Sequence, residues 1–217
     1  MSSKRGRTII VGGGGFCREL IFFITTTAEA GRIAPVGGYL DDQGDTLAGF
    51  DYPEAPWLGS VEDYTPQPGD GFVLAVGSPK AKRAVHAKLS ARGGVFPQMI
   101  HPGATIVRTA QLGEGVIFCP GTLSGADTRI GRFVTFNGSS GIGHDSTVGE
   151  FTTLSSHVDV TGNVTIGSDV LVGSNVSFLP KVKVGDGATV GAGSIVYRSI
   201  PAGATVYAPP AKLLKLR

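Results

Sequence analysis

A six-residue repeat runs through the second half of the chain and constrains its fold more than any other feature. Stepping by six from Ile100 gives seventeen positions, and sixteen of them carry a large apolar residue; Ser124 is the exception. Hydrophobic residues make up 41% of the chain, so such a run does not arise by chance. The positions are Ile100, Ile106, Leu112, Phe118, Ser124, Ile130, Phe136, Ile142, Val148, Leu154, Val160, Ile166, Val172, Phe178, Val184, Val190 and Val196.

A period of six matches neither the 3.6-residue turn of an α-helix nor the alternation of a simple strand. It is typical of a hexapeptide β-helix, in which each repeat forms one short strand and one corner, and three repeats close a triangular coil. We expect the large apolar residue, and the small or β-branched residue four positions later, to face the interior. Glycine often follows the large residue, as at Gly131 and Gly143, and we expect it to permit the bend at the corner. The uninterrupted stretch predicts about five to six coils.

Residues 1–97 follow a different pattern, in which apolar strands alternate with helices. Residues 8–11, 36–40 and 72–76 are predicted strands, and residues 16–30 form a predicted helix after the glycines at 12–15. Ser78 and Pro79 are typical of the start of a second helix, and Gly93 of its end. The pattern predicts a small parallel α/β domain over 1–97, followed by a β-helix domain with a C-terminal tail over 98–217.

Composition excludes several functions. The formal net charge of +2 favours neither a nucleic acid nor an acidic membrane surface as partner. No apolar run approaches the length of about 18 residues that a membrane span needs. The two cysteines, Cys17 and Cys119, indicate a reducing compartment rather than a disulfide framework, so we expect a cytoplasmic protein.

Several motifs, in order, resemble those of one enzyme family. They are residues 9–15 (IIVGGGG), 40–42 (LDD), 75–77 (AVG), 100–102 (IHP), 137–145, 161–164 (TGNV) and 208–212 (APPAK). Residues 100–210 resemble the hexapeptide acyltransferases. The whole chain resembles the bacterial nucleotide-sugar acetyltransferases of the bacillosamine, perosamine and sialic-acid pathways. The family usually has a small residue and a histidine in the glycine loop, where this chain has Gly13-Gly14-Gly15-Phe16, and a glycine at the position of Ala208.

The resemblance implies a fold, a co-substrate and an assembly. The fold is a Rossmann-like α/β domain that binds the nucleotide sugar, followed by a left-handed parallel β-helix. The co-substrate is acetyl-CoA, with no metal, and it is bound between the subunits of a homotrimer. The partner is a nucleotide-linked amino sugar.

His144 is the leading catalytic candidate. Acetyl transfer to an amine requires the amine to lose a proton, and histidine is suited to accept one near neutral pH. His144 lies two positions after the interior residue Ile142, so we expect it at an outward corner that faces a neighbouring subunit. The resemblance implies that Asp145 orients or polarises it. From the spacing alone, an exposed histidine on a turn is an alternative.

Four further residues are candidates for substrate or coenzyme contacts. Asn137 carries a carboxamide that can bond a sugar substituent, or it is a corner asparagine in a left-handed conformation. The resemblance places a coenzyme-contacting histidine at the position of Thr153, which makes His157 a weaker candidate. It also implies that the Gly162 N–H binds the thioester carbonyl, although another corner glycine is an alternative. Lys212, together with Lys215 and Arg217, gives a basic tail that meets the coenzyme phosphates or is simply solvated.

The glycines after the first strand indicate a phosphate site. Gly12, Gly13 and Gly14 lie between a strand and a helix, whose free N–H groups suit an anion. Cys17 takes the third glycine position of the dinucleotide fingerprint, which disfavours a nicotinamide cofactor. Asp41 and Asp42 end the second strand and can accept bonds from a base or ribose. Gly77 lies before the second helix. Together these residues predict a nucleotide-sugar site at the carboxyl ends of parallel strands.

Together, the residues and the resemblance predict an acetyl-CoA-dependent N-acetyltransferase acting on a nucleotide-linked 4-amino-4,6-dideoxy sugar. O-acetylation of the sialic-acid type and a non-catalytic nucleotide-sugar-binding protein are the alternatives. A zinc enzyme of the γ-carbonic anhydrase type would need three histidines per site, and only His144 and His157 lie in the predicted coils.

Overall fold

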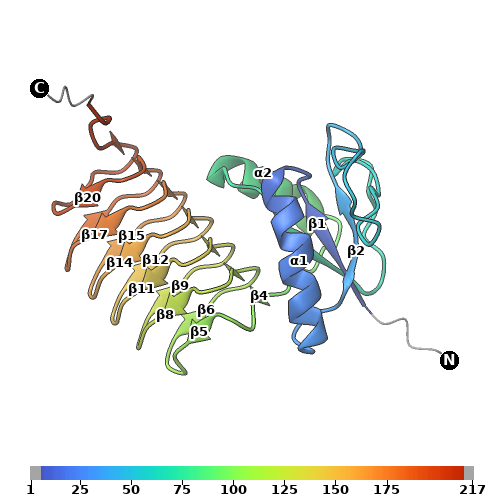
Figure 1. Cartoon of the computed structure of the whole chain (residues 1–217), viewed down its shortest axis with the longest axis horizontal. Helices are drawn as coiled ribbons and strands as arrows, with labels where there is room; N and C mark the ends of the chain where they lie inside the picture. The colour runs from blue at the N-terminus through green and yellow to red at the C-terminus, as the bar shows by residue number, and fades with distance from the viewer. Residues whose placement is uncertain (1–5, 213–217) are drawn as a thin grey trace, which may run out of the picture.

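The computed structural model describes residues 6–212 and divides them between a small parallel sheet with two helices and a long β-helix (Figure 1). The sheet has the order β2-β1-β3, with β1 at Arg7–Val11, β2 at Val36–Leu40 and β3 at Asp70–Leu74. The helices are α1 (Gly15–Glu29) and α2 (Pro79–Ser90). These elements confirm the alternation expected from the sequence, while a domain boundary at residue 97 stays a prediction.

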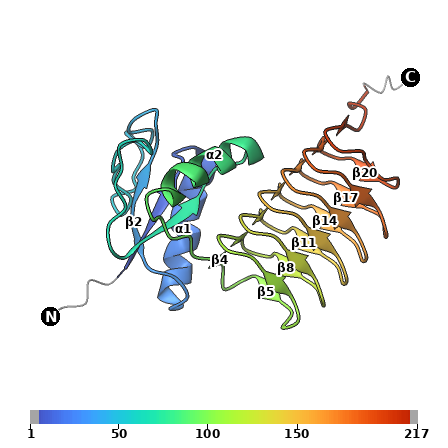
Figure 2. The ribbon, with the colours of Figure 1, turned by 180° about the vertical axis from the view of Figure 1, so that it is seen from behind.

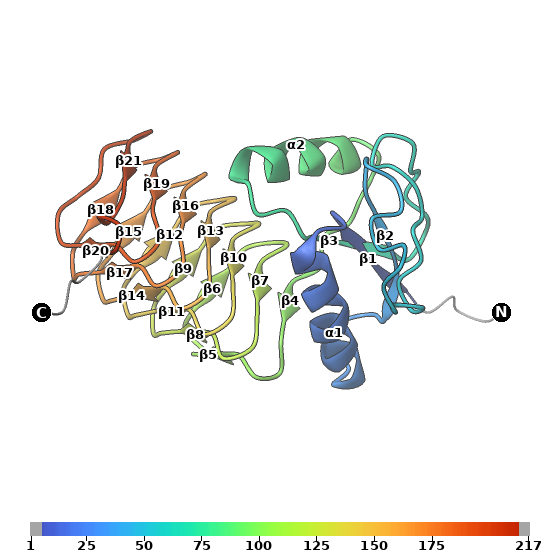
Figure 3. The same cartoon turned by 45° about the horizontal axis from the view of Figure 1, so that its top comes forward.

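The two helices cover opposite faces of the small sheet, and both faces continue into the β-helix. On one face, Ile10 packs with Leu20 of α1 and with Ile117 of the β-helix. On the other, Val11 packs with Leu89 of α2 and with a group of phenylalanines that includes Phe133. Figure 3 shows α1 beside β4 (Met99–Ile100) and α2 reaching along the neighbouring coils. Within the described part, neither helix is long and apolar enough to cross a bilayer.

The β-helix is a three-sided prism, and its three parallel sheets are here called the first, second and third faces. The first face contains β4 (Met99–Ile100), β7 (Ile117–Phe118), β10 (Thr135–Phe136), β13 (Thr153–Leu154), β16 (Leu171–Val172), β19 (Thr189–Val190) and β21 (Thr205–Val206). The second, seen in a row in Figure 2, contains β5 (Thr105–Ile106), β8 (Leu123–Ser124), β11 (Gly141–Ile142), β14 (Asp159–Val160), β17 (Ser177–Phe178) and β20 (Ile195–Val196). The third contains β6 (Gln111–Leu112), β9 (Arg129–Ile130), β12 (Thr147–Val148), β15 (Thr165–Ile166) and β18 (Lys183–Val184).

The register confirms the six-residue rule. Every position of the series from Ile100 to Val196 is the second residue of a two-residue strand. Phe136, for example, pairs with Leu154 of β13, eighteen residues or three repeats later. From Phe118 onward these residues are buried. Ser124, the exception, is fully buried too, because its hydroxyl bonds the Thr128 hydroxyl at 2.8 Å inside the prism.

Inward-facing hydroxyls are satisfied by the backbone of the next coil. Ser146 Oγ donates to the Thr161 carbonyl at 2.9 Å and accepts from the Val164 N–H at 2.9 Å. Thr152 Oγ1 makes the equivalent pair of bonds with Gly167 and Val170. A small polar residue four positions after the apolar one is therefore compatible with a dry interior.

The glycines after the interior residues have a different role from the one expected. They do not have positive φ; the left-handed corner residue comes two positions later, as at Asp145 (φ 59°) and His157 (φ 59°). At Gly143 a Cβ atom would lie 2.8 Å from the Thr161 carbonyl carbon, and at Gly131 it would lie 2.7 Å from the Glu150 nitrogen. Glycine is needed there because successive coils approach closely, so the expectation that it supplies the bend was wrong.

Candidate functional site

The three edges of the prism separate the sequence-predicted site residues. The edge between the first and second faces (first edge) holds Asn137 and His157. The edge between the second and third faces (second edge) holds His144, Asp145 and Gly162. The third edge, between the third and first faces, holds none of them; α2 lies against it instead. His144 and His157 therefore lie on different edges of one chain.

The second edge brings three predicted residues into contact. His144 Nδ1 lies 2.7 Å from Asp145 Oδ2, although the two residues are adjacent in sequence. The left-handed backbone of Asp145 turns its carboxylate back onto the ring. Both side chains are outward, with 64% of the His144 side chain and 56% of the Asp145 side chain exposed. The Asp145 carboxylate accepts a bond from Nδ1–H, which leaves Nε2 with the lone pair that a general base needs.

Gly162 lies one coil further along the same edge, directly against the His144 ring. A Cβ atom at Gly162 would lie 2.6 Å from both Cε1 and Nε2 of His144. Gly162 does not have positive φ, so a side chain there would not strain the backbone but would displace the imidazole from its position. Its N–H has no hydrogen-bond acceptor among residues 6–212. The edge thus combines a histidine base with an available backbone donor next to it.

On the first edge, some of the polar groups predicted to bind substrate or coenzyme already make hydrogen bonds within the chain. Asn137 Nδ2 donates to the Leu154 carbonyl at 3.1 Å, which leaves its Oδ1 as an acceptor. Asn137 does not have positive φ, so the left-handed alternative is wrong. His157 is exposed, and its N–H donates to the Gly138 carbonyl. Thr153 lies on the first face, not on an edge; it is buried and its hydroxyl accepts from Lys82 Nζ at 2.9 Å.

The carboxyl ends of β1, β2 and β3 bring the remaining predicted residues together. Gly12 follows β1 with φ 100°, and its N–H donates to the Leu40 carbonyl at the end of β2. At Gly13 a Cβ atom would overlap the Thr46 hydroxyl and lie 2.8 Å from the Tyr39 ring. Gly14 is the N-cap of α1 and supplies no side-chain bond, and the space beside it is open. Gly77 is exposed beyond the end of β3.

The two aspartates at the end of β2 bond the backbone of this end of the sheet. Asp41 Oδ2 accepts from the Gly13 N–H at 2.6 Å, and Asp41 Oδ1 accepts from the Gln43 N–H at 2.8 Å. Asp42 Oδ1 accepts from the Val61 N–H at 2.7 Å. Asp41 thus holds the glycine loop in place, and a bond from either carboxylate to a base or ribose stays a prediction.

The basic tail and the two cysteines complete the sequence-predicted features. Lys212 is exposed and makes no polar contact within the described part of the chain. Lys215 and Arg217 lie outside the described residues. Cys17 and Cys119 are buried, and burial raises the pKa of each thiol to about 12. Because the thiolate is the nucleophile, neither cysteine is arranged for an acyl-enzyme.

Sequence reasoning missed the basic residues of α2 and one stacked arginine. Lys82 is fully buried against the first face, and Arg83 pairs with Asp169. The Arg18 guanidinium lies 4.4 Å from the centroid of the exposed Phe50 ring. In a helix that contains three lysines and an arginine, nothing in the spacing separates a buried cation from solvated ones, so the sequence carried no signal for Lys82.

Comparisons with known proteins agree with this fold. The model of the bacterial transferase hexapeptide family (six repeats) matches residues 163–198. No match was found among curated proteins. Among solved structures, PerB from Caulobacter crescentus in complex with CoA and GDP-perosamine is 25% identical, with 97% of this chain and 98% of that chain covered and a TM-score of 0.82. The acetyltransferase domain of PglB from Neisseria gonorrhoeae in complex with acetyl coenzyme A is 25% identical, with 97% and 100% covered and a TM-score of 0.79.

A mutant of perosamine N-acetyltransferase from Caulobacter crescentus is 24% identical, covers 97% of each chain and has a TM-score of 0.83. The expected left-handed parallel β-helix of hexapeptide repeats is therefore confirmed. The repeat, the fold and the similarity over nearly the whole chain to structures with CoA or acetyl coenzyme A lead to one conclusion: this chain is an acyltransferase whose β-helix is built from hexapeptide repeats.

Proposed function

We propose that this acyltransferase moves the acetyl group of acetyl-CoA to the amino group of a nucleotide-linked 4-amino-4,6-dideoxy sugar, in the cytoplasm. The observation that carries the proposal is the arrangement on the second edge, where the Asp145 carboxylate holds His144 Nδ1 and the ring rests on Gly162. A solvated histidine on a turn would need neither the paired carboxylate nor the glycine under its ring.

In the proposed reaction the sugar amine attacks the thioester carbonyl carbon directly. His144 Nε2 takes the proton that the nitrogen loses as the C–N bond forms. The oxyanion of the tetrahedral intermediate accepts a bond from the Gly162 N–H, a contribution typically worth about 3 kcal/mol. The C–S bond then breaks, and the proton on His144 passes to the departing CoA sulfur. Asp145 keeps the ring in the tautomer that this sequence requires.

The acceptor is proposed to bind in the N-terminal half, residues 1–97, as a Rossmann-like domain. The open N-terminus of α1 at Gly14 suits the diphosphate, because free N–H groups and the helix dipole favour an anion. Asp41, Asp42 and Gly77 surround the same end of the sheet and would contact the base, ribose or sugar. The GDP-perosamine in the PerB complex supports a nucleotide-linked amino sugar as the substrate class.

A homotrimer is proposed because the candidate residues lie on separate edges. His144 lies on the second edge, and Asn137 and His157 lie on the first, so one coenzyme molecule that touches both edges would lie between two copies of the chain. Lys212 would meet the coenzyme phosphates. Mixed trimers of His144→Ala and His157→Ala chains test this arrangement. Sites between copies would regain part of the activity that both parent variants lack, whereas sites within one chain would regain none.

The experiment that tests the proposed function is a panel of nucleotide-linked sugars incubated with acetyl-CoA. The panel pairs uridine, thymidine and guanosine diphosphate sugars that carry a 4-amino group with hydroxyl counterparts, and release of CoA and product mass are followed. We expect one acetyl group on the amine and none on the hydroxyl counterparts. Acetylation of hydroxyls alone would favour the O-acetyltransferase. Failure of the protein to bind acetyl-CoA in calorimetry would favour a non-catalytic nucleotide-sugar-binding protein.

A further inference from the structure

Lys82 is a fully buried lysine that joins α2 to the β-helix. Its Nζ donates to the Phe133 carbonyl at 3.0 Å, to Thr135 Oγ1 at 3.0 Å and to Thr153 Oγ1 at 2.9 Å. An ammonium group has three protons, so these oxygens use all of them. Thr135 and Thr153 lie on adjacent strands, β10 and β13. The Lys82 side chain therefore bonds α2 to two successive coils of the β-helix.

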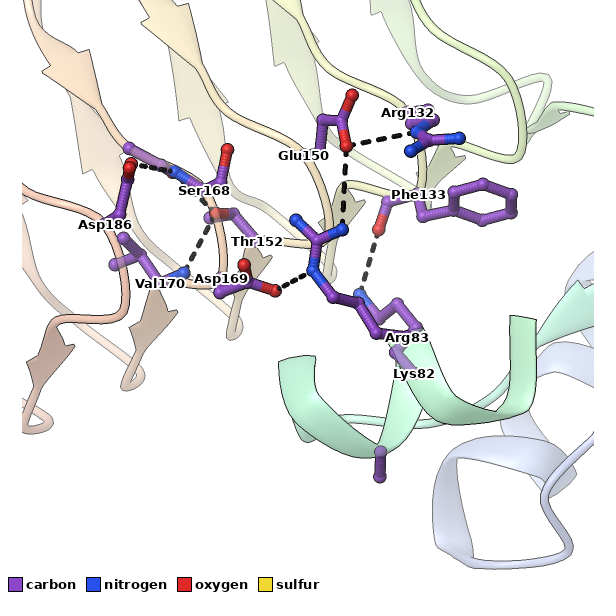
Figure 4. Close-up of polar contacts among 12 residues, drawn as sticks. Lys82, Arg83, Arg132, Phe133, Glu150, Thr152, Ser168, Asp169, Val170 and Asp186 are labelled. Carbon is purple, nitrogen blue, oxygen red and sulfur yellow. Dashed lines mark hydrogen bonds and ion pairs between the residues drawn. The ribbon is translucent and has the colours of Figure 1, made fainter. Parts of the chain in front are cut away.

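Arg83, the next residue of α2, contacts the third edge beside it (Figure 4). Its Nε donates to Asp169 Oδ1 at 2.6 Å, and its guanidinium carbon lies 4.1 Å from the centroid of the Phe151 ring. Phe151 in turn stacks on Phe133 at 4.8 Å between ring centroids. Lys82 and Arg83 thus fasten the same turn of α2 to the corner at Phe133 and to the next two coils.

This turn of α2 starts at the proposed acceptor site. Ser78 is the N-cap, with Pro79 at the first helical position, and the Lys82 N–H donates to the Ser78 carbonyl at 2.9 Å. Gly77, one of the predicted substrate residues, directly precedes the cap. One helical turn therefore separates the loop at the end of β3 from the three bonds of the Lys82 ammonium.

From these contacts we infer that Lys82 is a positioning residue for acetyl transfer: it holds the Gly77–Pro79 turn against the β-helix, and so fixes where the acceptor sugar is presented. The inference rests on the proposed function and deepens it. Reacting groups must be held within a fraction of an ångström of a productive geometry, so a support loosened by about 1 Å is costly. Lys82 does not itself touch substrate; it acts through Gly77 and Ser78.

The test compares Lys82→Met with Lys88→Met. Methionine keeps most of the buried stem and removes the three donors, whereas Lys88 lies on the same helix and pairs only with Glu62 at the surface. Hydrogen exchange over residues 77–83 and the Kd of GDP-perosamine, or of the panel sugar that the wild-type protein binds, are measured without acetyl-CoA. In Lys82→Met we expect the exchange rate over these residues to rise about tenfold and the acceptor Kd to rise about tenfold. The affinity for acetyl-CoA should stay within about twofold of the wild type. Lys88→Met should change none of these.

An acceptor Kd that stays at the wild-type value in Lys82→Met, with or without faster exchange, would overturn the inference and leave Lys82 a purely structural residue. Should Lys82→Met not fold, Thr153→Val removes one of the three acceptors and is judged by the same measurements, with a smaller rise in acceptor Kd expected and no rise refuting the idea. A wild-type protein that binds the nucleotide sugar without acetylating it would defeat the proposed acetyl transfer, whereas the acceptor Kd of Lys82→Met would still decide whether Lys82 positions the turn that binds the sugar.

Discussion

Replacing Lys82 by methionine should change how the stability of the protein depends on pH. Burial of the ammonium lowers the pKa of Lys82 from 10.5 to about 7, and the nearby Asp169 carboxylate opposes that shift only in part. In the unfolded chain the lysine keeps its usual pKa of about 10.4. Between these two values, the unfolded state binds a proton that the folded state does not. Stability of the wild-type protein therefore rises with pH across this window.

The magnitude follows from linkage. Each pH unit between the two pKa values adds up to about 1.4 kcal/mol to the free energy of unfolding. From about pH 7.5 to about pH 9, the wild-type protein should therefore gain about 2 kcal/mol over Lys82→Met, which has no group titrating at this position. Below about pH 6 the lysine is charged in both states, and the difference between the two proteins should no longer change.

The assay is denaturant unfolding of the two proteins at a series of pH values, with Lys88→Met as the matched control. The Lys88 pKa is raised by its hydrogen bond with Glu62, so Lys88 stays charged in both states over this range. The gap between wild type and Lys88→Met should stay constant with pH. If the gap between wild type and Lys82→Met is also constant from pH 7.5 to 9, the ammonium is not desolvated as described, and the reasoning fails.

Three other substitutions test the site and the fold. Asp145→Asn should lower kcat by about 10²-fold or more, because the ring loses the carboxylate that sets its tautomer, while asparagine tolerates the left-handed backbone and keeps the melting temperature. Gly162→Ala keeps the backbone N–H but places a methyl group 2.6 Å from the imidazole, so steady-state assays should show kcat falling by about tenfold with unchanged thermal stability. Leu154→Ala should cost about 2–5 kcal/mol in denaturant unfolding, because Leu154 is fully buried in the prism.

The fold could be predicted from the sequence because the β-helix repeats the same short pattern in every coil. Each large apolar residue sits in the same place in its coil, so a step of six identifies the interior from Ile100 to Val196 without knowledge of long-range contacts. The reason for the glycines could not be predicted in the same way. A glycine can be needed because the backbone has a positive φ or because a neighbouring segment leaves no room for a side chain. Only the short distance from Gly143 to the next coil shows that the second reason applies.

The candidate site was predictable where it depends on neighbours in sequence. His144 and Asp145 are adjacent, and a corner allows them to meet, which the 2.7 Å contact confirms. Contacts between distant segments were not predictable. Lys82 lies 71 residues from Thr153, and the two meet only because α2 lies against the third edge, where Lys82 reaches the first face. Asp41 similarly holds the glycine loop through a bond that depends on the pairing of β1 with β2.

The most direct test of the central claim is the turnover of His144→Ala with acetyl-CoA and the amino sugar that the wild-type protein acetylates. His144 is exposed, so its truncation should leave the assembly, the melting temperature and the affinity for acetyl-CoA unchanged. Because the variant lacks the general base, we expect its kcat to fall by about 10²–10⁴-fold. Near-normal turnover in this variant would contradict the account, because His144 is the proposed general base and its ring lies directly against Gly162.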